Sequence, residues 1–595
     1  MAAKHTVKKR AARQQSLVEG GVILALASVI VKIIGAIYKI PLIAVIGTDG
    51  NGFYTYAYNI YLVIYAMTVS GIPTAISRIV AELRTHGRYK DIKRLKKVSY
   101  VLMLIIGLIG SAVLFSTARL YAEETLKVPL AYYSILAVAP SILFSCLMAT
   151  HRGYSQGLRN MTPTAVSQII EVLVKVASGL SGAYIIGKRL SDEYRAFGTM
   201  FGQGVPVGTK PEVLASAYTS AMAIGGVTIS VFAGWIYMLI RDAVVSDGIT
   251  KEQIASSPDS FGFKALAKKI LSISIPIALS SATVYLAGFI DGITVTDRLI
   301  NVFEEHGREL FASYGGLLEK AGKSLSDDAS EIANFLYGAY GLSSPLFNLI
   351  PGITGAFGIS AMPHITVAWE DNNVKLVKKN TESVLRLTMV IAAPLGCGIC
   401  ALAAPITRVL YASRNSVSSE IVYPIVGVLG LVSILVAVTS SLTSVLQGVG
   451  RIDMPVKLMA LGAFLKVALN YILVGIPELN IKALALDNAV CYALIVILSF
   501  VTFKKTTGIK ISYYKVMIKP LMAGAGCGLA AWAADKLLLK VLVGRTSVCL
   551  LLSIIVGAVM YFVFMGLLKA VEEEDVLSLP GGAKLAKLLK KIHVL

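Results

Sequence analysis

Ionisable side chains inside long apolar stretches are the residues of this chain whose types and spacing could do chemistry. Lys32 and Lys39 are seven residues apart and therefore share one face of a helix. Glu171 and Lys175 are four residues apart, which places them together on a helix surface. A charge inside hydrocarbon costs about 3 kcal/mol on insertion scales, so these groups are candidates for a binding site.

Three further ionisable residues lie in other apolar stretches: Arg78, Asp291 (with Arg298 seven residues on) and Lys466. Basic residues outnumber acidic ones in this set, so a cavity lined by them would attract an anion. We expect a phosphate- or pyrophosphate-bearing molecule, because Lys and Arg supply the donors for such groups. The chain shows no Ser/His/Asp arrangement, no His/Cys metal spacing and no phosphate loop, so we expect a protein that is not an enzyme.

Each of these charges also has a purely structural interpretation. Arg78 and Lys39 could extend to the headgroups at the two membrane interfaces. Glu171 could form an ion pair with Lys175 within its own helix. Lys32 lies in the middle of its apolar stretch and has no partner within its helix, so a structural role explains it least well.

The composition requires membrane-spanning helices to hold these residues. The chain has 595 residues, of which 55% are hydrophobic and 15% charged, whereas soluble proteins carry about 25% charged residues. The net charge is +21, but the basic residues form short clusters between apolar runs, which is typical of membrane topology rather than of nucleic-acid binding. All 6 cysteines lie in or beside apolar segments, which excludes a disulfide-stapled secreted domain. We therefore predict an all-α polytopic membrane protein.

Windows of about 20 apolar residues predict fourteen transmembrane helices. They are expected near residues 20–46, 53–83, 98–121, 128–150, 163–187, 215–240, 266–296, 332–357, 384–411, 421–446, 455–475, 482–502, 516–539 and 546–569. Connections on one predicted side hold about 34 Lys and Arg, against about 15 on the other. Because positive connections stay in the cytoplasm, both termini are predicted to be cytoplasmic.

The two halves of the chain repeat each other weakly. Gln156-Gly157-Leu158 matches Gln447-Gly448-Val449, and Lys175 matches Lys466, each at an offset of 291 residues. Because six spans separate the halves, we predict two parallel six-helix repeats followed by two extra helices. The predicted parts are a basic tail (1–19), a six-helix bundle (20–240), a cytoplasmic linker (241–265), a second six-helix bundle (266–502), and helices 13 and 14 with a basic tail (503–595).

The outward connection at residues 297–331 alternates apolar residues, such as Leu299, Val302 and Leu310, with charged ones. This pattern predicts an amphipathic helix at the membrane interface or facing outward. Its apolar face would offer a surface for a partner protein.

Five segments carry a resemblance to a known family. They read KIIGAIYKIP (32–41), GTDGNGFY (47–54), GIPTAISR (71–78), GYSQG (153–157) and PTAVSQIIEVLVK (163–175). They resemble the MurJ/SpoVB branch of the multidrug/oligosaccharidyl-lipid/polysaccharide (MOP) exporter superfamily, and most closely its stage V sporulation protein B type. The resemblance implies a MATE-like fold. It also implies a flippase that moves an undecaprenyl-pyrophosphate-linked cell-wall precursor, similar to lipid II, to the outer leaflet of the bacterial plasma membrane by alternating access, for peptidoglycan or spore cortex synthesis.

The resemblance also assigns individual positions. It implies that Lys32 is a basic residue of the first helix facing a central cavity, and that Asp49 is the acidic residue of the first outer loop. The second-helix arginine of the family has no counterpart in the stretch 58–61, so we expect Arg78 or Lys175 to supply that charge. The candidate substrate-binding residues are therefore Lys32, Lys39, Asp49, Arg78, Glu171, Lys175, Asp291 and Lys466.

The implied partners are a polyprenyl-pyrophosphate glycolipid, the lipid bilayer and cell-wall synthesis proteins, without nucleic acid. No cofactor is expected, and a coupling ion (Na+ or H+) or the membrane potential would drive transport. Three alternatives stay open: a MATE-type cation-coupled drug exporter, a flippase for another polysaccharide precursor, and a non-transporting scaffold that binds through residues 297–331. A drug exporter should have an acidic or neutral cavity, because its substrates are cations.

Overall fold

The computed structural model of the chain describes residues 10–11, 15, 17–206, 208–258, 260–411, 416–542 and 544–572. Its contacts divide the chain into two compact units, Met1–Ile293 and Thr294–Leu595. The division falls inside helix α9 (Phe263–Ser313), so the first part of α9 belongs with the first unit. Most of the two predicted basic tails, at 1–9 and 573–595, lies outside the described residues.

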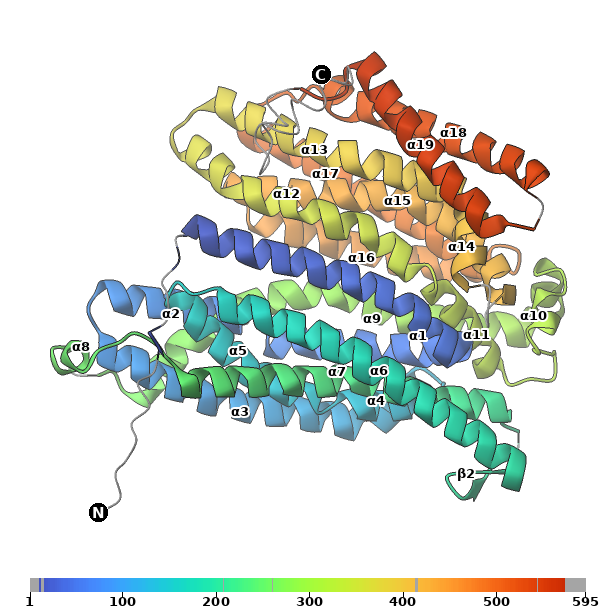
Figure 1. Cartoon of the computed structure of the whole chain (residues 1–595), viewed down its shortest axis with the longest axis horizontal. Coiled ribbons are helices and arrows are strands. Elements are labelled where there is room, and N and C mark those ends of the chain that lie inside the picture. The colour runs from blue at the N-terminus through green and yellow to red at the C-terminus, as the bar shows by residue number, and fades with distance from the viewer. Residues whose placement is uncertain are drawn as a thin grey trace. The chain divides into compact units, whose positions relative to one another are not determined.

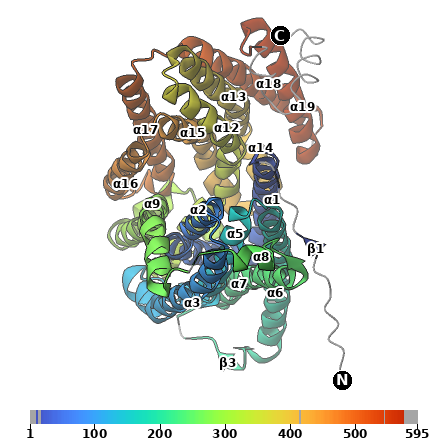
Figure 2. The same cartoon turned by 90° about the vertical axis from the view of Figure 1, so that its left-hand side faces the viewer.

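The first unit is built from long helices (Figure 1). They are α1 (Leu17–Thr68), α2 (Ile72–Thr85), α3 (Tyr89–Leu120), the π-helix η1 (Tyr121–Thr125), α4 (Ala131–Val138), α5 (Ser141–Gly157), α6 (Thr162–Phe197), α7 (Pro211–Val244), α8 (Lys251–Ala255) and the first part of α9. Helices α6 and α7 lie side by side, α1 packs on both, and α5 packs on α2, α3 and α7 (Figure 2). Two-residue strands pair β1 (Arg10–Ala11) with β4 (Val245–Ser246), and β2 (Thr199–Met200) with β3 (Gln203–Gly204).

Glycine and proline set the helix breaks of this unit. Gly47 has φ 74° and ψ 179° inside α1, a backbone conformation open to glycine because it has no Cβ. The predicted outer loop that follows the first span is therefore wrong: the chain kinks at one residue, and Asp49 lies within the helix. Pro73 opens α2, and Pro140 separates α4 from α5, so two predicted spans are each divided between two helices.

The GYSQG segment is a packing motif between α5 and α2. A Cβ added at Gly153 would lie 2.8 Å from the carbonyl oxygen of Pro73, and one added at Gly157 would lie 2.8 Å from the carbonyl oxygen of Ser77. Small residues four apart let two helix backbones approach closely in a membrane. The two glycines therefore fix the contact between α2 and α5.

We expect Gly157→Ala to lower the thermal midpoint of the protein in detergent, because the added methyl group overpacks this contact at a cost of about 1–3 kcal/mol. Gly35→Ala is the matched control, since Gly35 is also helical and an added Cβ there meets nothing within 4 Å. Alanine favours a helix over glycine, so this control should melt at the same or a higher temperature. Equal midpoints for the two variants would contradict the packing role.

Charged side chains close one end of the first unit in a network that we call the polar collar. Lys93 of α3 and Tyr154 of α5 both bind the carboxylate of Asp247, with the tyrosine hydroxyl at 2.6 Å. Lys96 of α3 binds the carboxylate of Asp242 on α7 at 2.6 Å. The collar therefore ties α3, α5 and α7 to the connection that follows α7.

The collar predicts an acid-sensitive stability. Burial acts to raise the pKa of Asp247, but hydrogen bonds from Lys93 and Tyr154 outweigh it and hold the pKa below its ordinary value. The contribution of Asp247 to stability is thus complete above the ordinary aspartate pKa of about 4 and is lost as pH falls toward the lower folded-state pKa. We expect Asp247→Asn to lower the thermal midpoint at pH 7 and to flatten its fall below pH 4. An unchanged acid dependence would contradict the role of this carboxylate.

The second unit follows from the remainder of α9. Its elements are α10 (Leu317–Lys320), α11 (Ala329–Gly341), α12 (Ser344–Glu370), α13 (Val374–Ala401), α14 (Ala403–Tyr411), α15 (Ser416–Gly448), α16 (Asp453–Leu473), the 3-10 turn η2 (Asn480–Lys482), α17 (Ala483–Thr507), the π-helix η3 (Tyr514–Ile518), α18 (Lys519–Val541) and α19 (Thr546–Leu568). Helix α15 is its centre, because it contacts α12, α13, α14 and α17.

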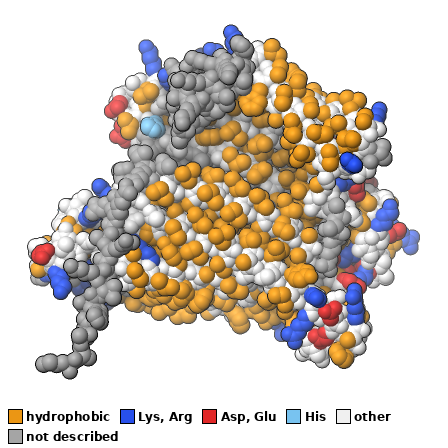
Figure 3. Space-filling model, viewed as in Figure 1, with side chains coloured by type: hydrophobic (Ala, Val, Ile, Leu, Met, Phe, Trp, Pro, Cys, Tyr) orange, Lys and Arg blue, Asp and Glu red, His pale blue; other side chains and the backbone are white. Residues whose placement is uncertain are grey.

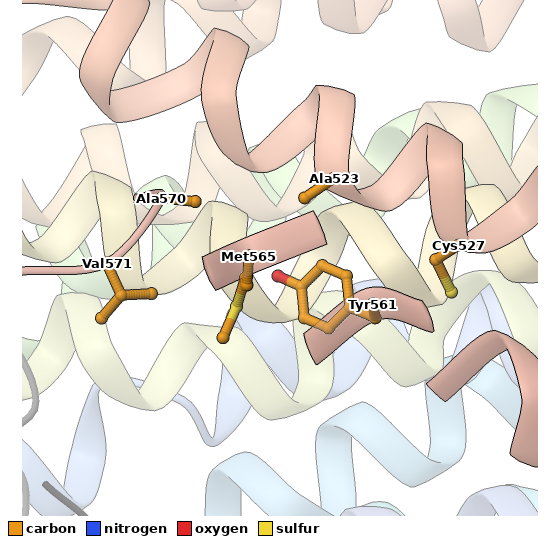
Figure 4. Packing of buried hydrophobic residues seen from close by; sticks show 6 residues of the cluster. All are labelled: Ala523, Cys527, Tyr561, Met565, Ala570 and Val571. Carbon is orange, nitrogen blue, oxygen red and sulfur yellow. The ribbon is translucent and has the colours of Figure 1, made fainter. Parts of the chain in front are cut away.

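The predicted helices 13 and 14 are α18 and α19, and they join the unit through small residues. A Cβ added at Gly528 of α18 would lie 2.9 Å from the carbonyl oxygen of Cys397 on α13. The hydroxyl of Tyr561 donates to the carbonyl oxygen of Val390 at 2.5 Å. Figure 4 shows the buried cluster around this contact, formed by Ala523, Cys527, Tyr561, Met565, Ala570 and Val571.

Helix boundaries in the two units follow the sequence repeat. Helix α5 ends at Gly157 and α15 ends at Gly448, while α6 begins at Thr162 and α16 begins at Asp453. Both pairs of boundaries are separated by the same offset as the sequence matches. Lys175 and Lys466 therefore occupy equivalent places in α6 and α16.

Twelve helical stretches among the described residues are long and apolar enough to cross a membrane. One of them, Leu26–Thr85, covers the first two predicted spans, and the predicted span at 266–296 falls in α9, outside the twelve. Hydrophobic side chains spread over the middle of the face in Figure 3, with charged side chains toward its edges. The prediction of an all-α polytopic membrane protein is confirmed, and the count of fourteen stays a prediction.

The segment at 297–331 folds onto the second unit. Leu299, Val302 and Leu310 are buried, and Lys323 Nζ lies 2.8 Å from the Glu331 carboxylate in a pair shielded from solvent. The predicted amphipathic pattern is present, but its apolar face packs inside the protein. It is therefore not a free surface for a partner.

Candidate functional site

Four ionisable side chains gather inside the first unit, and we call Lys39, Arg152, Glu171 and Lys175 the basic cluster. Lys39 comes from α1, Arg152 from the last turns of α5, and the other two from α6. Arg152 forms an ion pair with Glu171, and its guanidinium donates to Ser167 Oγ at 2.8 Å. Lys39 and Lys175 lie close enough for their like charges to interact. The cluster holds three positive groups against one negative group.

Glycines on α6 and α7 make room for this cluster. A Cβ added at Gly234 of α7 would lie 3.0 Å from Cγ of Glu171, so the carboxylate side chain passes where a larger residue would block it. A Cβ added at Gly226 would lie 2.7 Å from the Cα of Gly179, so the two backbones are in contact there. The close approach of α6 and α7 places the charges of α6 against α1 and α5.

Aromatic rings of α1 line the cluster. The rings of Tyr54, Tyr58, Tyr61 and Tyr65, which we call the tyrosine row, follow one helix face with successive centroids 5.9, 5.8 and 5.7 Å apart. Lys175 Nζ lies 5.2 Å from the centroid of Tyr58, and Lys39 Nζ lies 6.0 Å from that of Tyr54. Aromatic rings attract cations at this range, so the row helps to hold two lysines that would otherwise repel each other.

The two lysines are free to receive an anion. Within the described part of the chain, neither Lys39 nor Lys175 forms an ion pair, and each ammonium carries three donors. The carboxylate of Glu171 acts on Lys175 as well as on Arg152, but one carboxylate cannot balance three cations. An anion entering near the two lysines would therefore be stabilised. The arrangement is therefore suited to binding an oxyanion rather than to catalysis.

Three of the eight predicted site residues meet in the basic cluster: Lys39, Glu171 and Lys175. The ion pair between Glu171 and Lys175 that spacing within α6 suggested is not the one formed. Glu171 pairs instead with Arg152 of α5. Lys32 is exposed on α1 and lies outside the cluster. Its role as a cavity residue stays a prediction.

The other predicted residues lie elsewhere. Arg78 is exposed on α2, and the neighbouring carboxylate of Glu82 pairs with Lys269 of α9 at 2.6 Å. Asp49 is partly exposed in α1, and Asp291 is buried in α9. Lys466 is partly exposed on α16 of the second unit. Their roles in binding also stay predictions.

Of Arg78 and Lys175, the two residues expected to supply the missing positive charge, Lys175 lies beside the stretch 58–61, and its functional role stays a prediction. Its ammonium lies over the ring of Tyr58, in the stretch where the resemblance leads one to expect an arginine. Lys175 on α6 thus brings a positive charge to this part of α1.

Neither Arg152 nor the tyrosine row was predicted from the sequence. Arg152 lies two residues beyond the apolar run predicted to end at residue 150, whereas helix α5 continues to Gly157. The tyrosine row had a detectable signal, because tyrosines spaced by four, three and four residues share one helix face.

Comparison with solved structures identifies the fold. A structure described as "Lipid II flippase MurJ, inward closed conformation" aligns with a TM-score of 0.62 at 13% identity, covering 92% of this chain and 98% of that one. An inward-facing MATE family transporter of the MOP superfamily aligns with a TM-score of 0.57 at 13% identity, covering 82% and 99%. The fold is that of MOP membrane transporters and flippases, which are not enzymes.

Sequence comparison places the chain more narrowly. The family model described as "Polysaccharide biosynthesis protein" matches residues 17–304, and "Lipid II flippase MurJ" matches residues 337–570. In Bacillus subtilis (strain 168), Lipid II flippase MurJ is 24% identical over 84% of this chain and 85% of its own, and Stage V sporulation protein B is 22% identical over the same shares. The chain is thus similar over most of its length to the MurJ/SpoVB-type branch of the MOP superfamily, the resemblance that the sequence segments predicted.

Proposed function

We propose that this protein is a flippase that moves an undecaprenyl-pyrophosphate-linked cell-wall precursor, similar to lipid II, from the inner to the outer leaflet of the bacterial plasma membrane. Its similarity to proteins of the MurJ/SpoVB type supports a lipid-linked substrate. The product would serve peptidoglycan or spore cortex synthesis, and cell-wall synthesis proteins would be its partners.

The observation that carries the proposal is the excess of positive charge in the basic cluster. Lys39 and Lys175 lie within range of each other's charge and neither forms an ion pair in the described part of the chain, while the single acid, Glu171, is paired with Arg152. A pyrophosphate brings about two negative charges and several acceptor oxygens, which match two lysine ammonium groups. The isoprenoid tail would stay in the surrounding lipid.

The two units would carry the substrate by alternating access, opening first to the cytoplasm and then to the outside. Both termini would be cytoplasmic. An inside-negative membrane potential favours the outward movement of an anion by about 2.3 kcal/mol per charge for each 100 mV. The potential alone, or a coupling ion such as Na+ or H+, would drive the cycle. Lys32, Asp49, Arg78, Asp291 and Lys466 are proposed to line the path on either side of the basic cluster.

A MATE-type drug exporter is the second candidate, because a MATE transporter shares the fold. Its cationic substrates would be repelled by Lys39, Lys175 and Arg152, three positive groups around one carboxylate. This charge balance favours the flippase. A flippase for another polysaccharide precursor would use the same basic cluster, since the pyrophosphate is common to both substrates.

Reconstitution into liposomes tests the proposal. Purified protein should move a fluorescent undecaprenyl-pyrophosphate glycolipid between leaflets, measured by the change in its accessibility to an external quencher, and an imposed potential of favourable sign should raise the rate. Protein-free liposomes and liposomes offered a cationic dye are the controls. Transport of the dye without movement of the glycolipid would overturn the proposal in favour of the drug exporter.

A further inference from the structure

A cavity with two arginines in its wall lies apart from the basic cluster, at the end of the first unit where α8 lies (Figure 1). A partly enclosed cavity of about 60 Å³ is formed there by α2, α3, α5, α7 and the connection that follows α7. Water occupies about 30 Å³ per molecule in the liquid, and pockets for drug-sized ligands measure about 300–1,000 Å³. The cavity therefore suits a small oxyanion and excludes a sugar or an isoprenoid.

Two arginines give this cavity its charge. Arg84 of α2 and Arg241 of α7 line it, together with one carboxylate, Asp247. That carboxylate is already bound by Lys93 and Tyr154, so it does not neutralise the arginines. A guanidinium presents five donors in a planar fork that matches phosphate oxygens.

The donors of Arg84 are little used by the protein. Its hydrogen bond to a protein group among the described residues is a long one of 3.5 Å to the carbonyl oxygen of Leu158. Arg241 forms an ion pair with Asp242 at 3.1 Å. The same carboxylate is also paired with Lys96 at 2.6 Å, so it is shared between two cations. Both guanidinium groups keep donors for a ligand.

A buried hydroxyl points independently to a ligand. Ser155 of α5 lines the same cavity and is 2% exposed, yet its Oγ has no hydrogen-bond partner within the described part of the chain. Leaving a buried polar group unpaired costs about 1–3 kcal/mol, so native structures usually supply a partner. An oxyanion held by the two arginines would accept a hydrogen bond from this hydroxyl.

We propose that Arg84, Arg241 and Ser155 form a binding site for a phosphate oxyanion, either inorganic phosphate or the headgroup of an anionic lipid. A bound phosphate would neutralise the two arginines and join α2, α5 and α7 to the polar collar. The site does not depend on the proposed transport of a glycolipid.

Thermal unfolding of the full chain tests this site. In detergent, inorganic phosphate should raise the midpoint of the wild type above that in chloride of equal ionic strength. Arg84→Gln should weaken the apparent affinity for phosphate about tenfold or more, and Ser155→Ala should weaken it several-fold. Ser155→Ala removes an unpaired hydroxyl, so it should fold normally. Arg119→Gln is the control, because Arg119 is largely exposed and pairs with Glu123 away from the cavity.

Nanodiscs distinguish the two sources of phosphate. Thermal midpoints are compared, without free phosphate, between discs that contain phosphatidylglycerol and discs of phosphatidylcholine alone. If the ligand is a lipid headgroup, phosphatidylglycerol should raise the midpoint of the wild type more than that of Arg84→Gln. A response to inorganic phosphate without this lipid effect identifies a soluble anion. Either result supports the site. The proposed site is overturned if neither inorganic phosphate nor phosphatidylglycerol raises the thermal midpoint of the wild type. It is also overturned if the midpoints of Arg84→Gln and Ser155→Ala rise as much as that of the wild type.

Discussion

Arg152→Met should lower the free energy of unfolding by about 3–5 kcal/mol, one of the two largest effects expected from a single site in this chain. The substitution keeps an unbranched apolar side chain but removes the guanidinium that pairs with Glu171, whose side chain is 20% exposed. Once its ion pair is lost, the carboxylate keeps only the charge interaction with Lys175 to offset its desolvation cost. The thermal midpoint in detergent, followed by tryptophan fluorescence, measures the loss.

The double variant Arg152→Met/Glu171→Met separates the pair from other roles of the arginine. Because neither charge remains, most of the lost stability should return. Arg119→Met is the matched control, since it breaks an exposed pair with Glu123 that is worth no more than about 1 kcal/mol. A midpoint for Arg152→Met equal to that of Arg119→Met would show that Glu171 does not depend on its partner.

Lys39→Gln combined with Lys175→Gln should reduce glycolipid translocation by about a hundredfold or more. Each ammonium is expected to make charge-assisted hydrogen bonds to the pyrophosphate, worth about 1.5–3 kcal/mol apiece, which is about tenfold or more in affinity. Stability should stay equal or rise, because the substitutions remove a repulsion between like charges. Loss of activity with unchanged or improved stability is the mark of a binding site rather than of a structural pair.

Lys188→Gln is the control for this pair of substitutions, because Lys188 is an exposed lysine on the same helix as Lys175. It removes the same charge from α6 without touching the basic cluster. Translocation by Lys188→Gln should match the wild type. Equal rates for the control and for the double variant would remove the basic cluster from the transport mechanism.

Much of the fold follows from the sequence, because hydrophobic length and the placement of basic residues act over whole helices. The sequence matches around Gly157 and Gly448 predicted an internal repeat, and the ends of α5 and α15 fall at these two glycines. Breaks within helices were harder to predict. The connection at Gly47 is a kink rather than a loop, since one glycine can turn the backbone without leaving the helix for several residues.

The candidate site was predicted in part, because partners on different helices are not encoded by spacing. Spacing within α6 suggested that Glu171 pairs with Lys175, but packing brings Arg152 of α5 to the carboxylate instead. The meeting of Lys39 with Lys175 depends on how closely α1 approaches α6, which glycines such as Gly179 permit. Contacts of this kind depend on tertiary packing and become visible in the three-dimensional structure.

Direct binding of a water-soluble, short-chain prenyl-pyrophosphate glycolipid tests the central claim that the basic cluster receives the pyrophosphate. Isothermal titration of the wild type, the Lys39→Gln/Lys175→Gln variant and the Lys188→Gln control would give the dissociation constants. We predict that the wild type and the control bind equally, and that the double variant binds about a hundredfold more weakly. Equal affinity of all three proteins would contradict the assignment of the pyrophosphate to the basic cluster.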